Sequence, residues 1–194
     1  PLPLIKRFGM GYAPEGWNGL RDHLKSKGYS YEQMLQANLI QKSREKESYY
    51  DVFRNRVMVP ILDVSGNVIA FGGRLLDGKQ PKYLNTSDTP AFRKSKNLFA
   101  LNFAKDYCSD RMILCEGYMD VIALHGAGFS NAVATLGTAM TPDHARMMKR
   151  YTKSVVISYD ADTAGQNAAD KAFRLLGEVG LEARLLKVEN AKDP

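Results

Sequence analysis

Four short apolar runs alternate with helical stretches in the second half of the chain. The apolar runs are residues 112–115, 131–135, 154–159 and 183–188. The helical stretches between them are residues 118–126, 142–151 and 164–178. Strands that alternate with helices form parallel sheets with helical crossovers. Residues 111–194 are therefore predicted to form an α/β domain with a mostly parallel sheet flanked by helices.

The N-terminal part begins with a small helical region. Residues 15–26 have a helical pattern of apolar positions. Ser30 and Gln33 match the capping box that starts a helix, and this second helix is expected to reach about Ala37. Residues 41–48 are polar and charged, and we expect them to form a loop.

A strand pattern follows the helical region. Residues 57–62 and 68–71 are apolar and flank the turn residues 65–67, which predicts a hairpin. Pro60 indicates an edge strand or an irregularity, because proline has no N–H to give to a ladder. The pair Gly72–Gly73 allows close approach of another group to the backbone. Residues 82–84 are expected to form a short strand, and residues 101–107 a helix.

The positive charge of the chain is concentrated in its first part. The net charge is +6, and residues 1–110 hold 17 Lys and Arg against 11 Asp and Glu, whereas residues 111–194 hold ten of each. Residues 54–96 alone hold eight basic and three acidic residues. Such a stretch indicates either a polyanion partner or a solvated basic surface. Residues 1–110 are therefore predicted to be an α+β N-terminal basic subdomain.

The two cysteines, Cys108 and Cys115, indicate a reducing compartment. Cys115 lies in an apolar run and is expected to be a small buried hydrophobe. Two cysteines without a histidine at ligand spacing predict no zinc site. No apolar run approaches the roughly 20 residues that span a bilayer, so no membrane contact is expected. The first residue, Pro1, is not methionine, and the sequence is interpreted as a fragment.

Three carboxylates follow two of the predicted parallel strands. Glu116 comes directly after the first run, and Asp160 and Asp162 follow the third. Ligands of open parallel sheets bind beyond the carboxyl ends of the strands. Clustered carboxylates repel one another without a cation, and their hard oxygens suit Mg²⁺ or Mn²⁺. Asp193, after the fourth run, is a further candidate.

Two other interpretations of these carboxylates stay open at this point. Asp162 precedes a helical stretch and matches a helix N-cap. Residues 155–163 also resemble the nucleophile signature of haloacid-dehalogenase-type phosphatases, in which Asp160 would form an aspartyl phosphate and Asp162 would be the general acid. That signature normally opens its domain, whereas only 32 residues follow Asp162 here.

An ordered series of motifs resembles the DnaG-type primases. In the second half these are residues 116–121 (EGYMDV), 135–139 (TLGTA), 159–165 (YDADTAG) and 192–194 (KDP), which are similar to a Toprim domain. In the first half they are residues 8–14 (FGMGYAP) with Trp17, 53–61 (FRNRVMVPI), 72–74 (GGR), 81–86 (PKYLNT) and 92–96 (FRKSK). The resemblance covers nearly the whole chain, and the order of the motifs makes it specific.

The resemblance implies roles for particular residues. Glu116, Asp160 and Asp162 would be catalytic and would hold divalent metals, Asp193 would contribute, and Asp120 would be a supporting carboxylate. The positions implied to bind nucleotide phosphates or the DNA template are Arg56, Arg74, Lys82, Asn85, Lys94 and Lys96. Tyr83 would stack on a base, with a core-facing position as the alternative. His23, His125 and His144 match no catalytic position and are interpreted as structural.

The implied activity is primer synthesis. A primase of this family is a DNA-directed RNA polymerase that makes short RNA primers on single-stranded DNA from nucleoside triphosphates, by two-metal nucleotidyl transfer. The resemblance further implies a cytoplasmic location, a replicative helicase bound through a domain outside this chain, and guanosine tetraphosphate-type inhibitors at the nucleotide site. The family's zinc-binding domain is also outside the chain. A nucleic-acid-binding module without activity and a Toprim nuclease or topoisomerase are the alternative functions.

Overall fold

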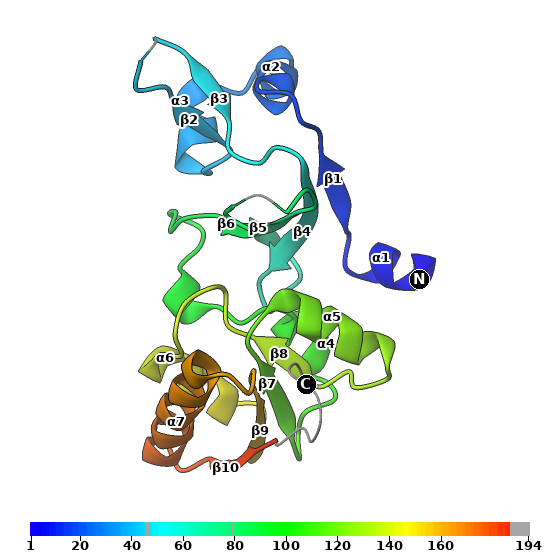
Figure 1. Cartoon of the computed structure of the whole chain (residues 1–194), viewed down its shortest axis with the longest axis vertical. Coiled ribbons are helices and arrows are strands. Elements are labelled where there is room, and N and C mark those ends of the chain that lie inside the picture. The colour runs from blue at the N-terminus through cyan, green and yellow to red at the C-terminus, as the bar shows by residue number, and fades with distance from the viewer. Residues whose placement is uncertain (46, 79, 187–194) are drawn as a thin grey trace. The chain divides into compact units, whose positions relative to one another are not determined.

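The computed structural model describes residues 1–45, 47–78 and 80–186, and these form two compact units (Figure 1). The first unit comprises Pro1–Ile61 and Val68–Arg93. The second comprises the turn Leu62–Asn67 and the chain from Lys94 onward. In the described part of the chain, no helix is long and apolar enough to cross a membrane.

The first unit has three short helices, α1 (Leu2–Arg7), α2 (Gly19–Ser26) and α3 (Tyr31–Gln36). The predicted capping box of α3 is confirmed, because Ser30 Oγ accepts from the N–H of Gln33 while the Gln33 side chain accepts from the N–H of Ser30. Helix α2 begins four residues later than predicted. Its first turn is capped by Asp51, which lies far away in the sequence.

Two sheets complete the first unit. The four-stranded sheet has the order β1 (Gly11–Ala13), β4 (Arg56–Leu62), β5 (Val68–Leu75), β6 (Tyr83–Asn85). The smaller sheet pairs β2 (Ile40–Lys42) with β3 (Tyr49–Asp51). The expected loop over residues 41–48 was therefore wrong at its start, where Gln41 and Lys42 belong to β2. Both are exposed, as the edge of a two-stranded ribbon allows.

The predicted hairpin is confirmed as β4 and β5, with a turn closed by a 2.9 Å hydrogen bond from Asp63 N to Asn67 O. Strand β4 is an inner strand, so the first alternative indicated by Pro60, an edge strand, was wrong, whereas the second, an irregularity, agrees with the incomplete pairing on the β1 side. Proline is tolerated there because β1 pairs with β4 only as far as Met58, two residues before Pro60.

The second unit contains the predicted parallel sheet. Its strands are β7 (Met112–Cys115), β8 (Ala132–Ala134), β9 (Ser154–Ser158) and β10 (Glu182–Leu185), in the order β10-β9-β7-β8. Its helices are α4 (Leu101–Ala104), α5 (Tyr118–Gly126), α6 (Pro142–Lys149) and α7 (Thr163–Glu178), with the 3₁₀ turn η1 (Lys94–Lys96) before them. All three strand pairs are parallel, which confirms the predicted fold class.

The crossovers place helices on both faces of this sheet. Parallel crossovers are right-handed, so α5 lies on one face and α6 and α7 lie on the other (Figure 1). The core alternates along the strands, with Met112 and Leu114 of β7 buried beside Val155 and Ile157 of β9. Cys115 is buried, as predicted, and so is Cys108, and burial raises the pKa of the Cys115 thiol to about 12.

Candidate functional site

The predicted carboxylates meet where the strand order of the second unit reverses. After β7 the chain runs through α5 to β8, and after β9 it runs through α7 to β10, on the opposite side of the β7–β9 pair. The crevice between two such strands is the ligand site of open parallel sheets. Cys115 of β7 pairs with Ser158 of β9, so Glu116 and Asp160 emerge next to each other at this edge.

A direct hydrogen bond joins the two loops that carry the carboxylates. The Asp160 backbone N–H donates to Glu116 Oε1 over 3.1 Å. Gly165 in the first turn of α7 packs against this contact. A Cβ atom at Gly165 would lie 2.2 Å from the Asp160 carbonyl oxygen and 2.8 Å from Glu116 Oε1. Only glycine therefore lets α7 approach the Glu116–Asp160 contact so closely.

Asp162 and Asp120 each cap the helix that follows a strand. Asp162 Oδ1 accepts a 2.8 Å hydrogen bond from the N–H of Gly165, which confirms the N-cap interpretation of Asp162. Asp120 Oδ2 accepts from the N–H of Gly117 over 3.1 Å at the start of α5. Both carboxylates are held in place by backbone amides, and capping does not exclude a second use of either.

A cavity of about 390 Å³ opens beside the carboxylates. Glu116, Asp162 and Tyr159 line it together with the loop after β8, Thr135 and residues 137–140. Glu116 and Asp162 are thus available to a ligand, and Asp160 is joined to this wall through its hydrogen bond with Glu116. Four of the five residues of the TLGTA sequence, all except Leu136, therefore belong to the cavity wall.

The electrostatics of Glu116 reflect this crowding. Burial is the largest cause that raises its pKa, and the charges of Asp160, Asp162 and Asp120 raise it further, while the hydrogen bond from Asp160 N opposes them. A cation would relieve this repulsion, and carboxylate oxygens are the donors that Mg²⁺ prefers. Among the residues that the structure describes, no three acidic, His or Cys side chains are already arranged as a metal cage. Asp193 lies outside the described residues.

The basic residues predicted in the first unit fall into two groups. Arg56 is buried, and its guanidinium donates to the carbonyl oxygens of Gly73, Pro81 and Lys82 at 3.3, 2.9 and 3.2 Å. It fits because Gly73 has no side chain, since a Cβ there would lie 2.9 Å from Arg56 Cδ. The anticipated close approach at this glycine pair is therefore made by Arg56, which organises the chain around residues 81–82.

Arg74, Lys82 and Tyr83 form a cationic and aromatic cluster, in which Lys82 and Tyr83 are exposed and Arg74 is half-buried. The Arg74 guanidinium lies 5.8 Å and the Lys82 ammonium 5.5 Å from the centre of the Tyr83 ring. Tyr83 is 43% exposed, so its core-facing alternative was wrong. Asn85, two residues further along β6, has a buried Oδ1 with no hydrogen-bond partner among the described residues. A buried amide oxygen without a protein partner is costly, so Asn85 Oδ1 is an acceptor for a water molecule or a ligand group.

Lys94 and Lys96 lie on η1 in the second unit. The Lys94 carbonyl accepts a 2.8 Å hydrogen bond from His144 Nε2, and the Thr141 hydroxyl donates to Ser95 O over 2.9 Å. These contacts fasten η1 to the start of α6. The Lys96 side chain is exposed, and the pKa of Asp143 is lowered first by the hydrogen bond from Arg146 and further by the charge of Lys96.

The sequence interpretation did not single out Trp17 and Arg54 as site residues. The Arg54 guanidinium carbon lies 4.1 Å from the centre of the Trp17 ring and 5.2 Å from that of Tyr50. Together with Asn85 these residues line a pocket of about 570 Å³ in the first unit, called the tryptophan groove below. The available signal was that Trp17 is the single tryptophan of the chain and lies in a Gly- and Pro-rich motif. In the structure its ring is 60% exposed.

Comparison with known proteins gives the same assignment in both halves of the chain. Residues 3–105 match the family described as the DNA primase catalytic core, N-terminal domain, and residues 113–194 match the Toprim-like family. The predicted domain boundary after residue 110 lies between these ranges and stays a prediction. A DNA primase of Clostridium acetobutylicum is 49% identical over 191 residues, covering 98% of this chain and 32% of that protein. The chain thus spans about a third of the length of this relative.

Two solved structures are similar throughout the chain. A DnaG primase catalytic domain bound to single-stranded DNA is 37% identical with a TM-score of 0.88, covering 100% of this chain and 62% of that one. The RNA polymerase domain of Mycobacterium tuberculosis primase DnaG is 34% identical with a TM-score of 0.88, covering 100% and 66%. The first family match alone includes more than half of the chain, and the second includes the carboxylates, so the phosphatase interpretation is rejected. The chain belongs to the family of DnaG-type primase catalytic cores, in which a Toprim-like domain follows the N-terminal domain of the core.

Proposed function

We propose that this chain is the catalytic part of a DNA-directed RNA polymerase that makes short RNA primers on single-stranded DNA. One observation carries the proposal, the convergence of Glu116, Asp160 and Asp162 at the strand-order reversal beside an open cavity. The similarity in sequence and structure to the RNA polymerase domain of Mycobacterium tuberculosis primase DnaG supports it. The nucleoside triphosphates are the substrates, and a replicative helicase and a guanosine tetraphosphate-type inhibitor are further proposed partners.

The carboxylates fit a divalent cation, either Mg²⁺ or Mn²⁺. Glu116, Asp160 and Asp162 would hold it, with Asp120 as a supporting carboxylate, and Asp193 is a further proposed ligand. The pKa of Glu116 is raised first by burial and then by the charges of Asp160, Asp162 and Asp120, and a nearby cation would offset both effects. A pair of such ions activates an attacking hydroxyl and stabilises the leaving group in an in-line displacement. The chain itself contributes rigidity, because the Asp160 amide fixes Glu116 and the Gly165 amide fixes Asp162.

The first unit is proposed to bind the template and the nucleotide phosphates. Arg74, Lys82 and Tyr83 offer two cations around one exposed ring, which suits phosphates next to a stacked base. Asn85 offers its unpaired Oδ1 to a base donor in the tryptophan groove. Arg56 acts by holding the carbonyls of residues 81–82, and Lys94 and Lys96 add positive charge in the second unit.

The test is primer synthesis on single-stranded DNA by Asp160→Asn and Glu116→Gln variants. Each is expected to lose about 100-fold or more in rate, since an ion site that supplies several kcal/mol would be lost. Asp170→Asn is the matched control, because Asp170 is exposed on α7 and lies outside the cavity. The thermal shift caused by Mg²⁺ is measured in parallel and should shrink in both site variants. Full activity of either site variant would refute the metal assignment.

A further inference from the structure

A second pocket of the first unit, here called the hairpin pocket, lies between α2 and the β2–β3 ribbon. Its volume is about 610 Å³, and Trp17, Arg21, Lys42, Arg44, Tyr49 and Tyr50 are prominent among the residues that line it. None of the roles implied by the family motifs, nor the primer synthesis proposed above, uses this pocket.

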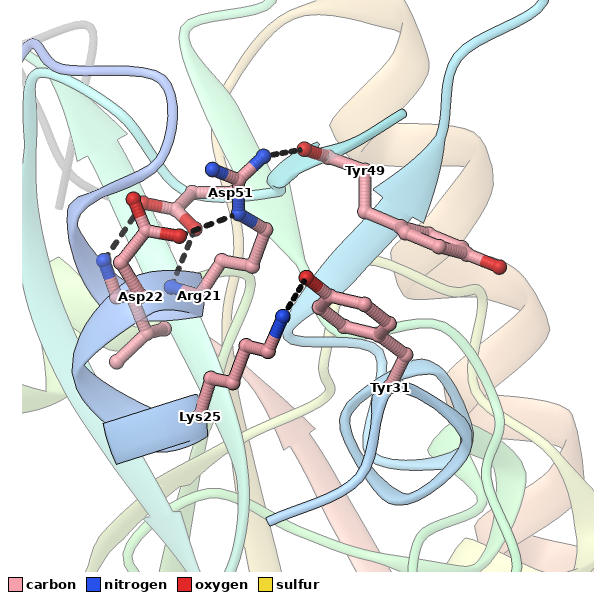
Figure 2. Close-up of polar contacts among 7 residues, drawn as sticks. Arg21, Asp22, Lys25, Tyr31, Tyr49 and Asp51 are labelled. Carbon is pink, nitrogen blue, oxygen red and sulfur yellow. Dashed lines mark hydrogen bonds and ion pairs between the residues drawn. The ribbon is translucent and has the colours of Figure 1, made fainter. Parts of the chain in front are cut away.

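The α2 wall of the hairpin pocket is rigidly built. The Asp51 carboxylate accepts from the N–H groups of Leu20 and Arg21 at 2.8 and 2.9 Å and so caps α2, and the Arg21 guanidinium donates to Tyr49 O at 2.6 Å (Figure 2). Arg21 also pairs with Asp22 at 2.7 Å. These contacts fix α2 to β3 before any ligand arrives. They also use the charge of Arg21, so Arg21 shapes the pocket and is not its anion ligand.

Behind this wall, aromatic packing supports the ribbon. Tyr31 of α3 stacks on Tyr49 with ring centres 4.7 Å apart, and its hydroxyl accepts from Lys25 Nζ at 3.1 Å (Figure 2). The ribbon that carries Lys42 is therefore braced from α2 and α3 together. A braced ribbon can present its charges at fixed positions.

Lys42 and Arg44 are the cations that remain for a ligand. Both are exposed, and within the described part of the chain neither makes an ion pair or a hydrogen bond through its side chain. Among the residues that line the pocket, Glu45 is the acidic one, and it is set against Lys42 and Arg44, because the charge of Arg21 is already paired with Asp22. The pocket thus has a surplus of positive charge, which suits phosphate groups.

The hairpin pocket continues the tryptophan groove. The two share Trp17, Gln41 and Tyr50 in their walls. The rings of Trp17 and Tyr50 meet edge to face with centres 5.7 Å apart, and the Tyr50 hydroxyl donates to Gln41 Oε1 at 3.1 Å. A ridge of aromatic rings between a groove and a cationic pocket is the arrangement that holds single-stranded nucleic acid, with bases on the rings and phosphates on the cations.

We infer that the hairpin pocket binds the phosphodiester backbone of single-stranded DNA where the strand passes beyond the tryptophan groove, with Lys42 and Arg44 each contacting one phosphate. This inference rests on the proposed function, in which the groove holds the template. It deepens that function by extending the strand's path over the β2–β3 ribbon. A free nucleoside triphosphate has the same phosphate chemistry and is the competing occupant.

The test follows binding through the fluorescence of Trp17, the single tryptophan. Oligothymidylates of about 4 and about 12 nucleotides are titrated over a range of salt concentrations, because single-strand sites vary within about these lengths. The variant is Lys42→Ala/Arg44→Ala. Lys27→Ala is the control, because Lys27 is exposed at the end of α2 and outside both pockets.

The double variant should bind the long oligonucleotide about 10- to 30-fold more weakly at low salt, and its salt slope should fall by about 1.4, since each single-strand phosphate contact contributes about 0.7. Its affinity for the short oligonucleotide should match that of the unaltered chain and of Lys27→Ala. Adding a nucleoside triphosphate should leave unchanged the ratio of the affinities of the unaltered chain for the long and the short oligonucleotide.

The outcomes separate the two proposals. Absence of any fluorescence change in the unaltered chain would overturn the template role of the tryptophan groove. Binding of both oligonucleotides with equal affinity, or an equal loss for both lengths in the double variant, would overturn the extended path alone. Displacement by the nucleoside triphosphate would also overturn it, in favour of a nucleotide site. Melting temperatures of all variants show that each is folded.

Discussion

Replacing Gly165 by alanine should destabilise the second unit, although alanine is the better helix former. The added Cβ would lie 2.2 Å from the Asp160 carbonyl oxygen, 2.9 Å from the Asp160 carbonyl carbon and 2.8 Å from Glu116 Oε1. Two of these atoms are backbone and cannot swing aside. Helix α7 or the Asp160 loop must therefore move, and the 3.1 Å hydrogen bond from Asp160 N to Glu116 is the contact most exposed to that movement.

The magnitude is a difference between two terms. Overpacking costs about 1–3 kcal/mol, and the upper part of that range applies because the clash is with backbone. Alanine recovers up to about 1 kcal/mol of helix propensity. The free energy of unfolding should therefore fall by about 1–2 kcal/mol. Binding of Mg²⁺, followed as a thermal shift, should weaken as well, because Glu116 and Asp160 no longer hold their relative positions.

Gly177→Ala is the matched control in the same helix. Nothing lies within 4 Å of a Cβ at Gly177, so only the propensity term acts, and this variant should be more stable by about 0.5–1 kcal/mol. Urea denaturation of the two variants gives both numbers. If Gly165→Ala proved as stable as Gly177→Ala, the close approach of α7 to the carboxylates would be refuted.

Two further predictions concern buried polar groups in each unit. Asp51→Ala leaves the amides of Leu20 and Arg21 without their acceptor, so the free energy of unfolding should fall by about 1–2 kcal/mol. The fluorescence of Trp17 should change as well, because its carbonyl accepts from Asp51 N. An emission spectrum identical to that of the unaltered chain would contradict the link between Asp51 and Trp17. Burial lowers the pKa of His144, so the unfolded chain binds more protons than the folded one near this pH. The free energy of unfolding should therefore fall as the pH drops below about 6.5 and become constant below the lowered pKa. His144→Gln should flatten this part of the plot of unfolding free energy against pH, measured by urea denaturation, and parallel plots for the two proteins would contradict the assignment.

The sheet of the second unit could be predicted because its signal is local. The three strands β7, β8 and β9 are mostly buried apolar runs, and the crossover helix α6 has a clear start signal in Thr141 before Pro142. In the first unit the decisive contacts are distant in sequence. The start of α2 was misplaced because its cap is Asp51, some 30 residues downstream. The β2 strand was missed because its exposed residues are polar like those of a loop.

The candidate site shows the same division. The carboxylates could be identified because strand ends and motif order are both written in the sequence. The packing of Arg56 under Gly73 could not, since the sequence contains both residues but not their contact. The pairing of Arg54 with Trp17 was hidden for the same reason, because nothing local marks two residues 37 positions apart as partners. The count of charged residues located the basic region. It could not distinguish a basic side chain that is available to bind phosphate from one that already contacts backbone carbonyls or aromatic rings.

Asp162 shows why two interpretations of one residue need not compete. Its Oδ1 accepts from the first turn of α7, which fixes the side chain at the edge of the cavity. A carboxylate has a second oxygen, and a fixed carboxylate loses less conformational freedom when it binds a cation than a mobile one does. The same cap has a cost, because the positive end of the helix dipole competes with the cation for the charge of Asp162. Glu116 and Asp160 would then have to supply the larger part of the attraction. Burial and the acidic neighbours of Glu116 raise its pKa and so disfavour its charged form, and a bound cation would favour that form again.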